Sequence, residues 1–260
     1  MLSSIEDYRE SKDTFRELKI SDHAMKQILD FTKNKTNSFN KEAINIITFN
    51  MLMNNYSINN NSRLLFQLDD INGISYLKNS EVYRDVYEKY STIFKDIRYF
   101  PVSKDITGEA DVTYENSWKR PRTYGGNRIH EGTDIMASNN KAGYFPVISV
   151  SDGVVEQKGW LEQGGYRIGI RSESGAYFYY AHLASYNEEL EKGDVVTAGT
   201  NLGFMGNTGY SKVVGTTGKF DVHLHFGIYL DDNGKEMSVN PYWVLKYLED
   251  YKLYFNKNTQ

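Results

Sequence analysis

The stretch that decides the fold is Asp221-Val222-His223-Leu224-His225-Phe226-Gly227-Ile228-Tyr229-Leu230. In a β-strand alternate side chains share a face, so this run predicts one apolar face and one face that carries His223 and His225. An α-helix would turn the two histidines about 200° apart. The strand therefore places two imidazoles side by side above Gly227, whose small size leaves room, and this favours a metal or catalytic site. The alternative is an exposed strand face with two incidental histidines.

A second cluster is the pair His130 and Asp134, four residues apart. Gly132 between them disfavours a helix, so a turn or an extended segment must present the two side chains. The segment fails the His-Glu-x-x-His zinc motif because position 134 is Asp. Taken alone, the spacing is common by chance and favours a surface carboxylate or one that only supports a site.

A third cluster surrounds His182, which follows Tyr179-Tyr180-Ala181. Strand alternation predicts Tyr180 and His182 on one face and Ala181 and Leu183 on the other. A single histidine beside aromatic residues is more often a buried structural residue than a catalyst. The fifth histidine, His23, has no partner at metal-binding spacing.

Together the three clusters indicate more than each does alone. Two histidines and one aspartate form a familiar set of catalytic zinc ligands, and two histidines remain. Zinc lowers the pKa of a bound water to about 7 and polarises a carbonyl. A neighbouring imidazole can then accept a proton or stabilise charge on the oxygen. Three ligands and two helpers would make a peptide hydrolase.

The composition of the chain changes near residues 96–100. Residues 1–96 contain no proline and a single glycine, and they show apolar residues at helical spacing. Ser21-Asp22 and the segment 38–40 are candidate helix caps. We therefore predict an α+β protein, with a helical accessory region at 1–96 and a β-rich, mainly antiparallel domain with a groove at 97–260.

The β-rich part carries all four prolines and short β-favouring runs between its glycines. The runs are PVISVSDGVVEQ (146–157), YRIGIRS (166–172), AYFYYAHL (176–183) and VHLHFGIYL (222–230). A closing helix is predicted from Asn240 to Tyr254, with Pro241 suited to its first position.

Composition excludes several classes of function. The 260 residues carry a net charge of -4 and no cysteine, so disulfides, thiolate metal ligands and a thiol nucleophile are excluded, and no bulk attraction to nucleic acid is expected. No apolar run is long enough to span a membrane, which takes about 18 residues or more, and the first residues do not form a signal peptide. The chain is either cytoplasmic or an exported protein whose signal or anchor segment lies outside this sequence.

The combined pattern resembles the LytM/lysostaphin-type metallopeptidases. The order His-x3-Asp, Tyr-Ala-His-Leu and His-x-His carries the resemblance, which extends over roughly residues 100–245. Further matching segments are Pro121-Arg122-Thr123-Tyr124-Gly125-Gly126, Asp152–Val155, Lys192–Val196 and Gly203–Gly209. The resemblance implies one zinc ion bound by His130, Asp134 and His225, with His182 and His223 as the catalytic pair.

The resemblance also implies a substrate, the peptide of bacterial peptidoglycan, and hence an extracytoplasmic place at the cell surface, in the wall or secreted. It does not extend to residues 1–96, which could position the domain at the wall, mediate self-association or cover the groove. The alternative function is a non-catalytic wall-binding or signalling module of the same fold.

A biotinyl- or lipoyl-type carrier is a further alternative, suggested by the turn pattern of residues 190–199. A carrier needs its lysine at the tip of a tight hairpin, whereas Lys192 precedes an ordinary turn at Gly193-Asp194. The carrier interpretation would also leave the histidines unexplained.

Overall fold

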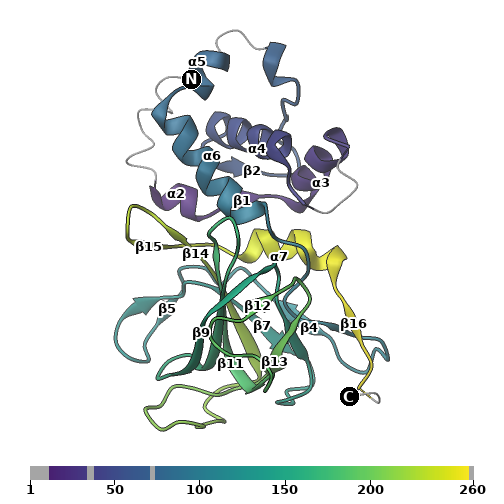
Figure 1. The fold of residues 1–260 in the computed structure, drawn as a ribbon, viewed down its shortest axis with the longest axis vertical. Helices are drawn as coiled ribbons and strands as arrows, with labels where there is room; N and C mark the ends of the chain where they lie inside the picture. The colour runs from purple at the N-terminus through teal and green to yellow at the C-terminus, as the bar shows by residue number, and fades with distance from the viewer. Residues whose placement is uncertain (1–11, 34–37, 71–73, 258–260) are drawn as a thin grey trace.

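The structure is a computed structural model that describes residues 12–33, 38–70 and 74–257. Figure 1 shows helices at one end, a large β-sheet at the other, and α7 between them. The helical end contains α2 (Lys12–Arg16), β1 (Lys19–Ile20), α3 (Asp22–Phe31), α4 (Lys41–Met53), β2 (Ser57–Ile58), η2 (Leu68–Asp70), α5 (Ile74–Lys78) and α6 (Glu81–Phe94). The predicted α+β class, helices followed by a mainly antiparallel β-rich region, is confirmed.

The elements after α6 build the sheet and its surroundings. They are β3 (Lys104–Asp105), β4 (Val112–Tyr114), β5 (Pro121–Arg122), β6 (Arg128–Ile129), β7 (Thr133–Ala137), β8 (Pro146–Ile148), β9 (Gly153–Leu161), β10 (Gly165–Arg171), β11 (Tyr177–Tyr186), β12 (Val195–Val196), β13 (Asn201–Met205), β14 (His223–Asp231), β15 (Glu236–Val239), α7 (Tyr242–Leu248), η3 (Glu249–Tyr251) and β16 (Tyr254–Phe255). The main sheet has the strand order β12-β9-β10-β11-β14-β7-β4. The inner strand β14 pairs antiparallel with β11 and β7.

Alternation along β14 separates the core from the opposite face. Its apolar residues are at most 2% exposed, namely Val222 just before the strand and Leu224, Phe226, Ile228 and Leu230 within it. His223, His225 and Tyr229 point to the other face, where they line a groove. The strand and the two faces predicted from the sequence are therefore confirmed.

Two of the predicted helix caps are present. The Ser21 hydroxyl accepts a hydrogen bond from the Ala24 amide at the start of α3. The Asn40 side chain accepts one from the Ala43 amide at the start of α4. Such caps satisfy amides that the first turn leaves unpaired, and each contributes about 1 kcal/mol.

Two predicted elements differ from the structure. The run at 146–157 divides into β8 and β9, because a turn at Ser149–Asp152 interrupts it. The closing helix ends at Leu248 rather than continuing to Tyr254, and a short 3-10 turn follows. Tyr254 and Phe255 instead form β16, which pairs parallel with β3, and the Phe255 ring packs against Tyr144.

The helices and the sheet share one continuous apolar core. Phe39 is 1% exposed, and its ring lies 5.2 Å from both Phe94 of α6 and Tyr247 of α7. Ion pairs such as Lys26–Asp250, at 2.6 Å, join the two parts at the surface. Fully burying one large apolar side chain stabilises the fold by about 1.5–3 kcal/mol, so this shared core binds the helices firmly to the sheet.

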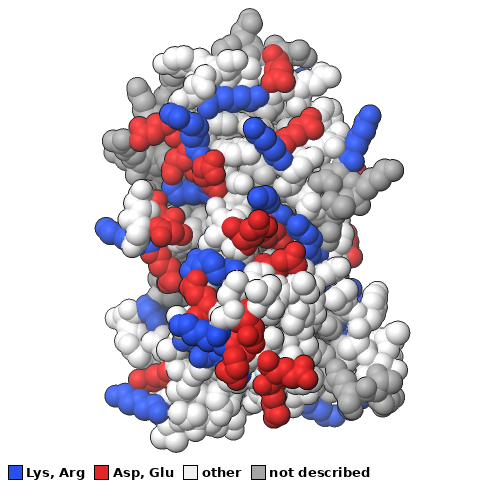
Figure 2. Space-filling model, in the orientation of Figure 1, with Lys and Arg blue, Asp and Glu red and all other residues white. Residues whose placement is uncertain are grey.

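Charged side chains of both signs are mixed over the face shown in Figure 2. Among the described residues, no helix combines the length and the apolar character that crossing a bilayer requires.

Candidate metal centre

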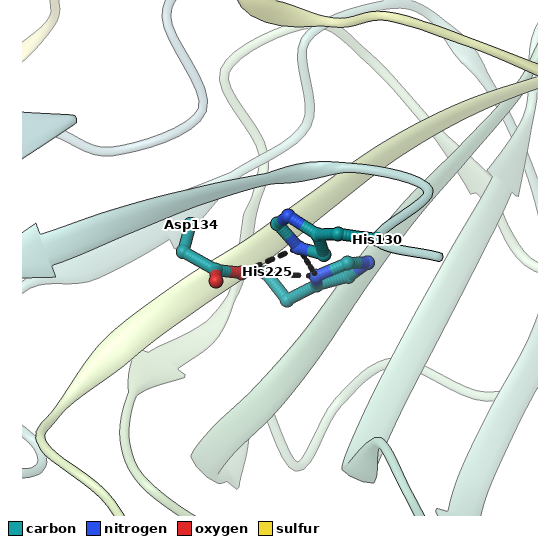
Figure 3. Close-up of side chains that lie close together, drawn as sticks. All are labelled: His130, Asp134 and His225. Carbon is teal, nitrogen blue, oxygen red and sulfur yellow. Dashed lines mark hydrogen bonds and ion pairs between the residues drawn. The ribbon is translucent and has the colours of Figure 1, made fainter. Parts of the chain in front are cut away.

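Three side chains predicted as metal ligands converge at one end of the groove. His130 Nε2 and His225 Nδ1 each lie 3.0 Å from Asp134 Oδ1, and the two nitrogens are 3.0 Å apart. Figure 3 shows the three side chains pointing toward one another. Strand pairing brings two of them together, because Asp134 of β7 lies directly opposite His225 of β14.

The donor set fits a zinc ion. With bonds of 2.0–2.1 Å, a tetrahedral zinc separates neighbouring ligand atoms by about 3.3 Å, close to the distances between these three atoms. His130 Nδ1 lies 3.1 Å from the Ser117 carbonyl oxygen, which can only accept a hydrogen bond, so Nδ1 carries the proton. The Nε2 lone pair is then free to face a metal, as ligand histidines require.

Asp134 is held as an ionised carboxylate. Burial alone would raise its pKa, but the close contacts of its carboxylate with the His130 and His225 rings outweigh burial and lower the pKa. Its second oxygen, Oδ2, accepts a hydrogen bond from Arg122 Nη2. The sequence pattern placed Arg122 at the entry to the site but did not predict that it orients a candidate ligand.

His182 reaches the groove because β11 carries a bulge, so the predicted alternation is wrong here. Tyr180 is fully buried in the core, and Leu183 also faces the core, whereas Ala181 and His182 both line the groove. The two residues between Tyr180 and Leu183 stand opposite Arg167 alone on β10. His182 has a φ of +65°, an uncommon conformation for a residue with a side chain and one that concentrates at functional sites.

The rings of His182 and His223 lie next to each other, with centroids 4.7 Å apart. Each Nδ1 lies 2.7 Å from a carbonyl oxygen, that of Thr208 for His182 and that of Asp221 for His223. A carbonyl can only accept, so both Nδ1 atoms donate and both Nε2 atoms lack a proton in the neutral rings. His223 Nε2 lies 3.8 Å from Asp134 Oδ1, which places the pair beside the candidate ligands.

Burial keeps this pair neutral. It lowers the pKa of His182 well below its ordinary value, and the neighbouring histidines add to the effect. Burial also lowers the pKa of His223, although Asp134 opposes the change. Both rings can therefore accept a proton at neutral pH. The fifth histidine, His23, is exposed on α3, away from the groove.

A contact from the helical end supports the loop that carries His130. Arg16 Nη2 donates to Glu131 Oε1 at 2.8 Å and to the Ser238 hydroxyl at 2.7 Å, and that hydroxyl donates to the same Glu131 oxygen at 2.6 Å. The Arg16 guanidinium also lies over the Trp118 ring at 5.6 Å. Sequence patterns gave no signal for this contact because its partners are more than 100 positions apart.

The groove has a volume of about 690 Å³. Its lining residues fall between Arg122 and Glu236, and none comes from the described part of the helical region. Tyr177, Tyr179 and Tyr229 line the groove with their rings next to one another, and we call them the aromatic floor; the Tyr179 ring lies 6.0 Å from the His225 ring. Room for these rings comes from glycines, since a Cβ at Gly169 would lie 1.9 Å from the Tyr177 hydroxyl oxygen.

We expect Gly132→Ala to weaken zinc binding by about 10- to 100-fold, the range found when groups that orient ligands are disturbed. A Cβ at Gly132 would lie 2.5 Å from the His225 ring and 2.8 Å from the Phe226 carbonyl oxygen. The ring must then move from its present position. Competition with a fluorescent zinc chelator measures the change.

Gly143→Ala is the matched control, because Gly143 has a φ of +78° and no atom near its Cβ position. It should lower thermal stability through backbone strain and leave zinc affinity unchanged. Equal zinc affinity in Gly132→Ala and wild type would contradict the assignment of His225 as a ligand.

The comparisons with known proteins identify the class. Residues 128–241 match the family model described as Peptidase family M23. The chain belongs to this family, the LytM/lysostaphin-type peptidases.

Particular relatives extend the match. A solved structure from Ruminococcus gnavus, described as a candidate glycyl-glycine endopeptidase lytM, is 40% identical with a TM-score of 0.75. The match covers 94% of this chain and 93% of the Ruminococcus gnavus chain. It therefore includes the helical region, which the family resemblance in the sequence did not cover.

Two curated proteins match a little over half of the chain. The L-Ala–D-Glu endopeptidase of Bacillus subtilis is 44% identical over 142 residues, 55% of this chain and 42% of that protein. Lysostaphin of Staphylococcus staphylolyticus is 30% identical over 148 residues, 54% of this chain and 28% of that protein. The chain thus spans less than half the length of these relatives.

Proposed function

We propose that this chain is a zinc-dependent endopeptidase that hydrolyses peptide bonds in bacterial peptidoglycan. The observation that carries the proposal is the arrangement of three ligand atoms within 3.0 Å of one another beside two buried, neutral imidazoles. Family membership and the endopeptidase relatives support it.

His130, Asp134 and His225 would hold the metal. A zinc ion in this position supplies a Lewis acid that polarises a peptide carbonyl and acidifies water. Arg122 holds the second carboxylate oxygen of Asp134, and Ser117 fixes the orientation of the His130 ring. These contacts reduce the reorganisation needed when the ligands bind the ion.

His182 and His223 would handle the protons. Each presents an unprotonated Nε2 to the groove, held in that tautomer by a backbone carbonyl. Such a nitrogen can accept the proton of an attacking water and then, as N–H, donate to the carbonyl oxygen or the departing amine. The aromatic floor offers a dry surface along which an extended peptide can lie.

The proposed substrate also indicates where the protein would act. Peptidoglycan lies outside the cytoplasmic membrane, so we place the activity extracytoplasmically, at the cell surface or in the wall. We also propose residues 97–260 as the peptidase region and residues 1–96 as a helical region that braces it through Arg16 and the shared core.

The test uses the full chain purified without chelators. Elemental analysis should find about one zinc per chain, and mass spectrometry of peptidoglycan digests should detect peptides with new amino termini. A chelator should abolish the hydrolysis, and added zinc should restore it. Zinc near zero in active protein, or hydrolysis unaffected by zinc removal, would refute the proposal.

A further inference from the structure

Arg167 is a cationic side chain of the groove that the proposed mechanism does not use. It lies on β10 and lines the groove together with Tyr177 and Tyr179. Its strand neighbours on the opposite face, Ile168 and Ile170, belong to the core. Alternation along β10 thus directs the guanidinium toward the space where a substrate would lie.

The guanidinium of Arg167 has no anionic partner among residues 12–33, 38–70 and 74–257. Its Nη1 is buried and forms no hydrogen bond there. The other arginines of this face are occupied. Arg122 binds Asp134, Arg128 binds the Tyr124 carbonyl and the Tyr210 hydroxyl, and Arg171 binds both oxygens of Glu156.

A buried donor without a partner costs free energy. Arg167 as a whole is only half-buried and lines the groove, so the rest of its guanidinium remains open to a ligand. A group of this kind in a native structure calls for an explanation, and a missing ligand is one that the groove can supply.

The position of Arg167 relates it to the reacting bond. It stands opposite the bulge that carries His182. Burial raises the pKa of the Tyr179 hydroxyl, and the positive charge of Arg167 acts in the opposite direction and lowers it. The Tyr179 ring in turn lies 6.0 Å from the His225 ring. A ligand held by Arg167 would therefore lie in the groove that also contains the candidate metal centre.

The chemistry of an unpaired guanidinium selects a carboxylate, which it can bind with two parallel hydrogen bonds. The relatives differ in this respect. A glycyl-glycine chain carries no side-chain charge, whereas a glutamyl residue keeps one carboxyl group free after the other has formed its peptide bond.

We propose that Arg167 binds the free carboxylate of a residue beside the scissile bond, so that the enzyme prefers acidic peptides of the L-Ala–D-Glu kind to glycine bridges. This inference rests on the proposed endopeptidase function and assigns its substrate class.

The experiment compares three peptides with the zinc-loaded full chain. One contains an L-Ala–D-Glu bond with the glutamyl carboxylate free, the second has that carboxylate converted to an amide, and the third is pentaglycine. Wild type should cleave the free acid with a kcat/KM about 10- to 100-fold above that for the amide, the range expected for a hydrogen bond to a charged group. Arg167→Gln should remove this difference mainly by slowing cleavage of the acid.

Arg171→Gln is the matched control. Arg171 lies on the same strand and face as Arg167, but Glu156 already neutralises its charge. This variant should keep the preference. Arg167→Lys should keep part of the preference for the free acid. If Arg167→Gln fails to fold, the preference of the wild type and that of Arg167→Lys still test the role of Arg167. Calorimetry with metal-free protein should show tighter binding of the free acid than of the amide, independently of turnover.

The outcomes separate the two proposals. Cleavage of pentaglycine or the amide as fast as the acid, or an unchanged preference in folded Arg167→Gln, overturns the role of Arg167 alone. Absence of cleavage of all three peptides and of whole peptidoglycan overturns the endopeptidase function, and the inference falls with it.

Discussion

Replacing His225 by alanine is expected to remove bound zinc and to lower peptidoglycan hydrolysis by at least about 10³-fold. The ring supplies one of three converging candidate ligand atoms, and its Nδ1 lies 3.0 Å from both of the others. A metal site of this kind contributes several kcal/mol of transition-state stabilisation, and each 1.36 kcal/mol corresponds to a factor of ten in rate. Zinc content by elemental analysis and release of new amino groups from peptidoglycan measure the two effects.

His23→Ala is the control, because His23 is an exposed histidine on α3, remote from the groove. It should retain full zinc content and full activity. Peptidoglycan hydrolysis at the wild-type rate by His225→Ala would eliminate the proposed centre.

The second large effect concerns the two remaining groove histidines. His182→Ala and His223→Ala should each reduce kcat by about 10²- to 10⁴-fold, the range for loss of a general acid–base group. Each should retain about one zinc per chain, since neither belongs to the group of three converging ligand atoms. The separation of activity from metal content distinguishes these two residues from His225.

These variants also decide between the enzyme and the non-catalytic module. A wall-binding module would bind peptidoglycan equally well with and without His182, and neither it nor its variants would release new amino groups. Circular dichroism should confirm folding of His182→Ala, because its backbone at position 182 is already in the left-handed region. Loss of zinc together with activity would instead make His182 or His223 a ligand or a structural residue.

The sequence predicted those elements whose structure depends on residues close together in the chain. The alternation from Val222 to Leu230 identified β14 and its two faces, because a side-chain period of two is a property of the strand itself. The caps at Ser21 and Asn40 were predictable for the same reason, since a cap bonds to an amide three residues away. The convergence of His130, Asp134 and His225 came from the family resemblance, and no pattern within a single segment would have predicted it.

The features that were not predictable depend on partners distant in the sequence. The bulge at His182 arises from the pairing of β11 with β10 and from a hydrogen bond between the His182 amide and the Gly164 carbonyl. The segment after the end of α7 at Leu248 docks through Phe255 against Tyr144, a partner more than 100 positions away. Arg167 carried no sequence signal at all, because its importance lies in a missing partner, which only a folded structure reveals.

The bridge from Arg16 to Glu131 has a consequence for how the proposed enzyme would be controlled. Many hydrolases are made as zymogens, whose leading segment is cut away to release activity. Here removal of the helices would delete the contact that supports the His130 loop and would expose the side of α7 against which Phe39 packs. Loss of the helices should therefore lower the proposed activity, whereas a zymogen gains activity when its leading segment is removed.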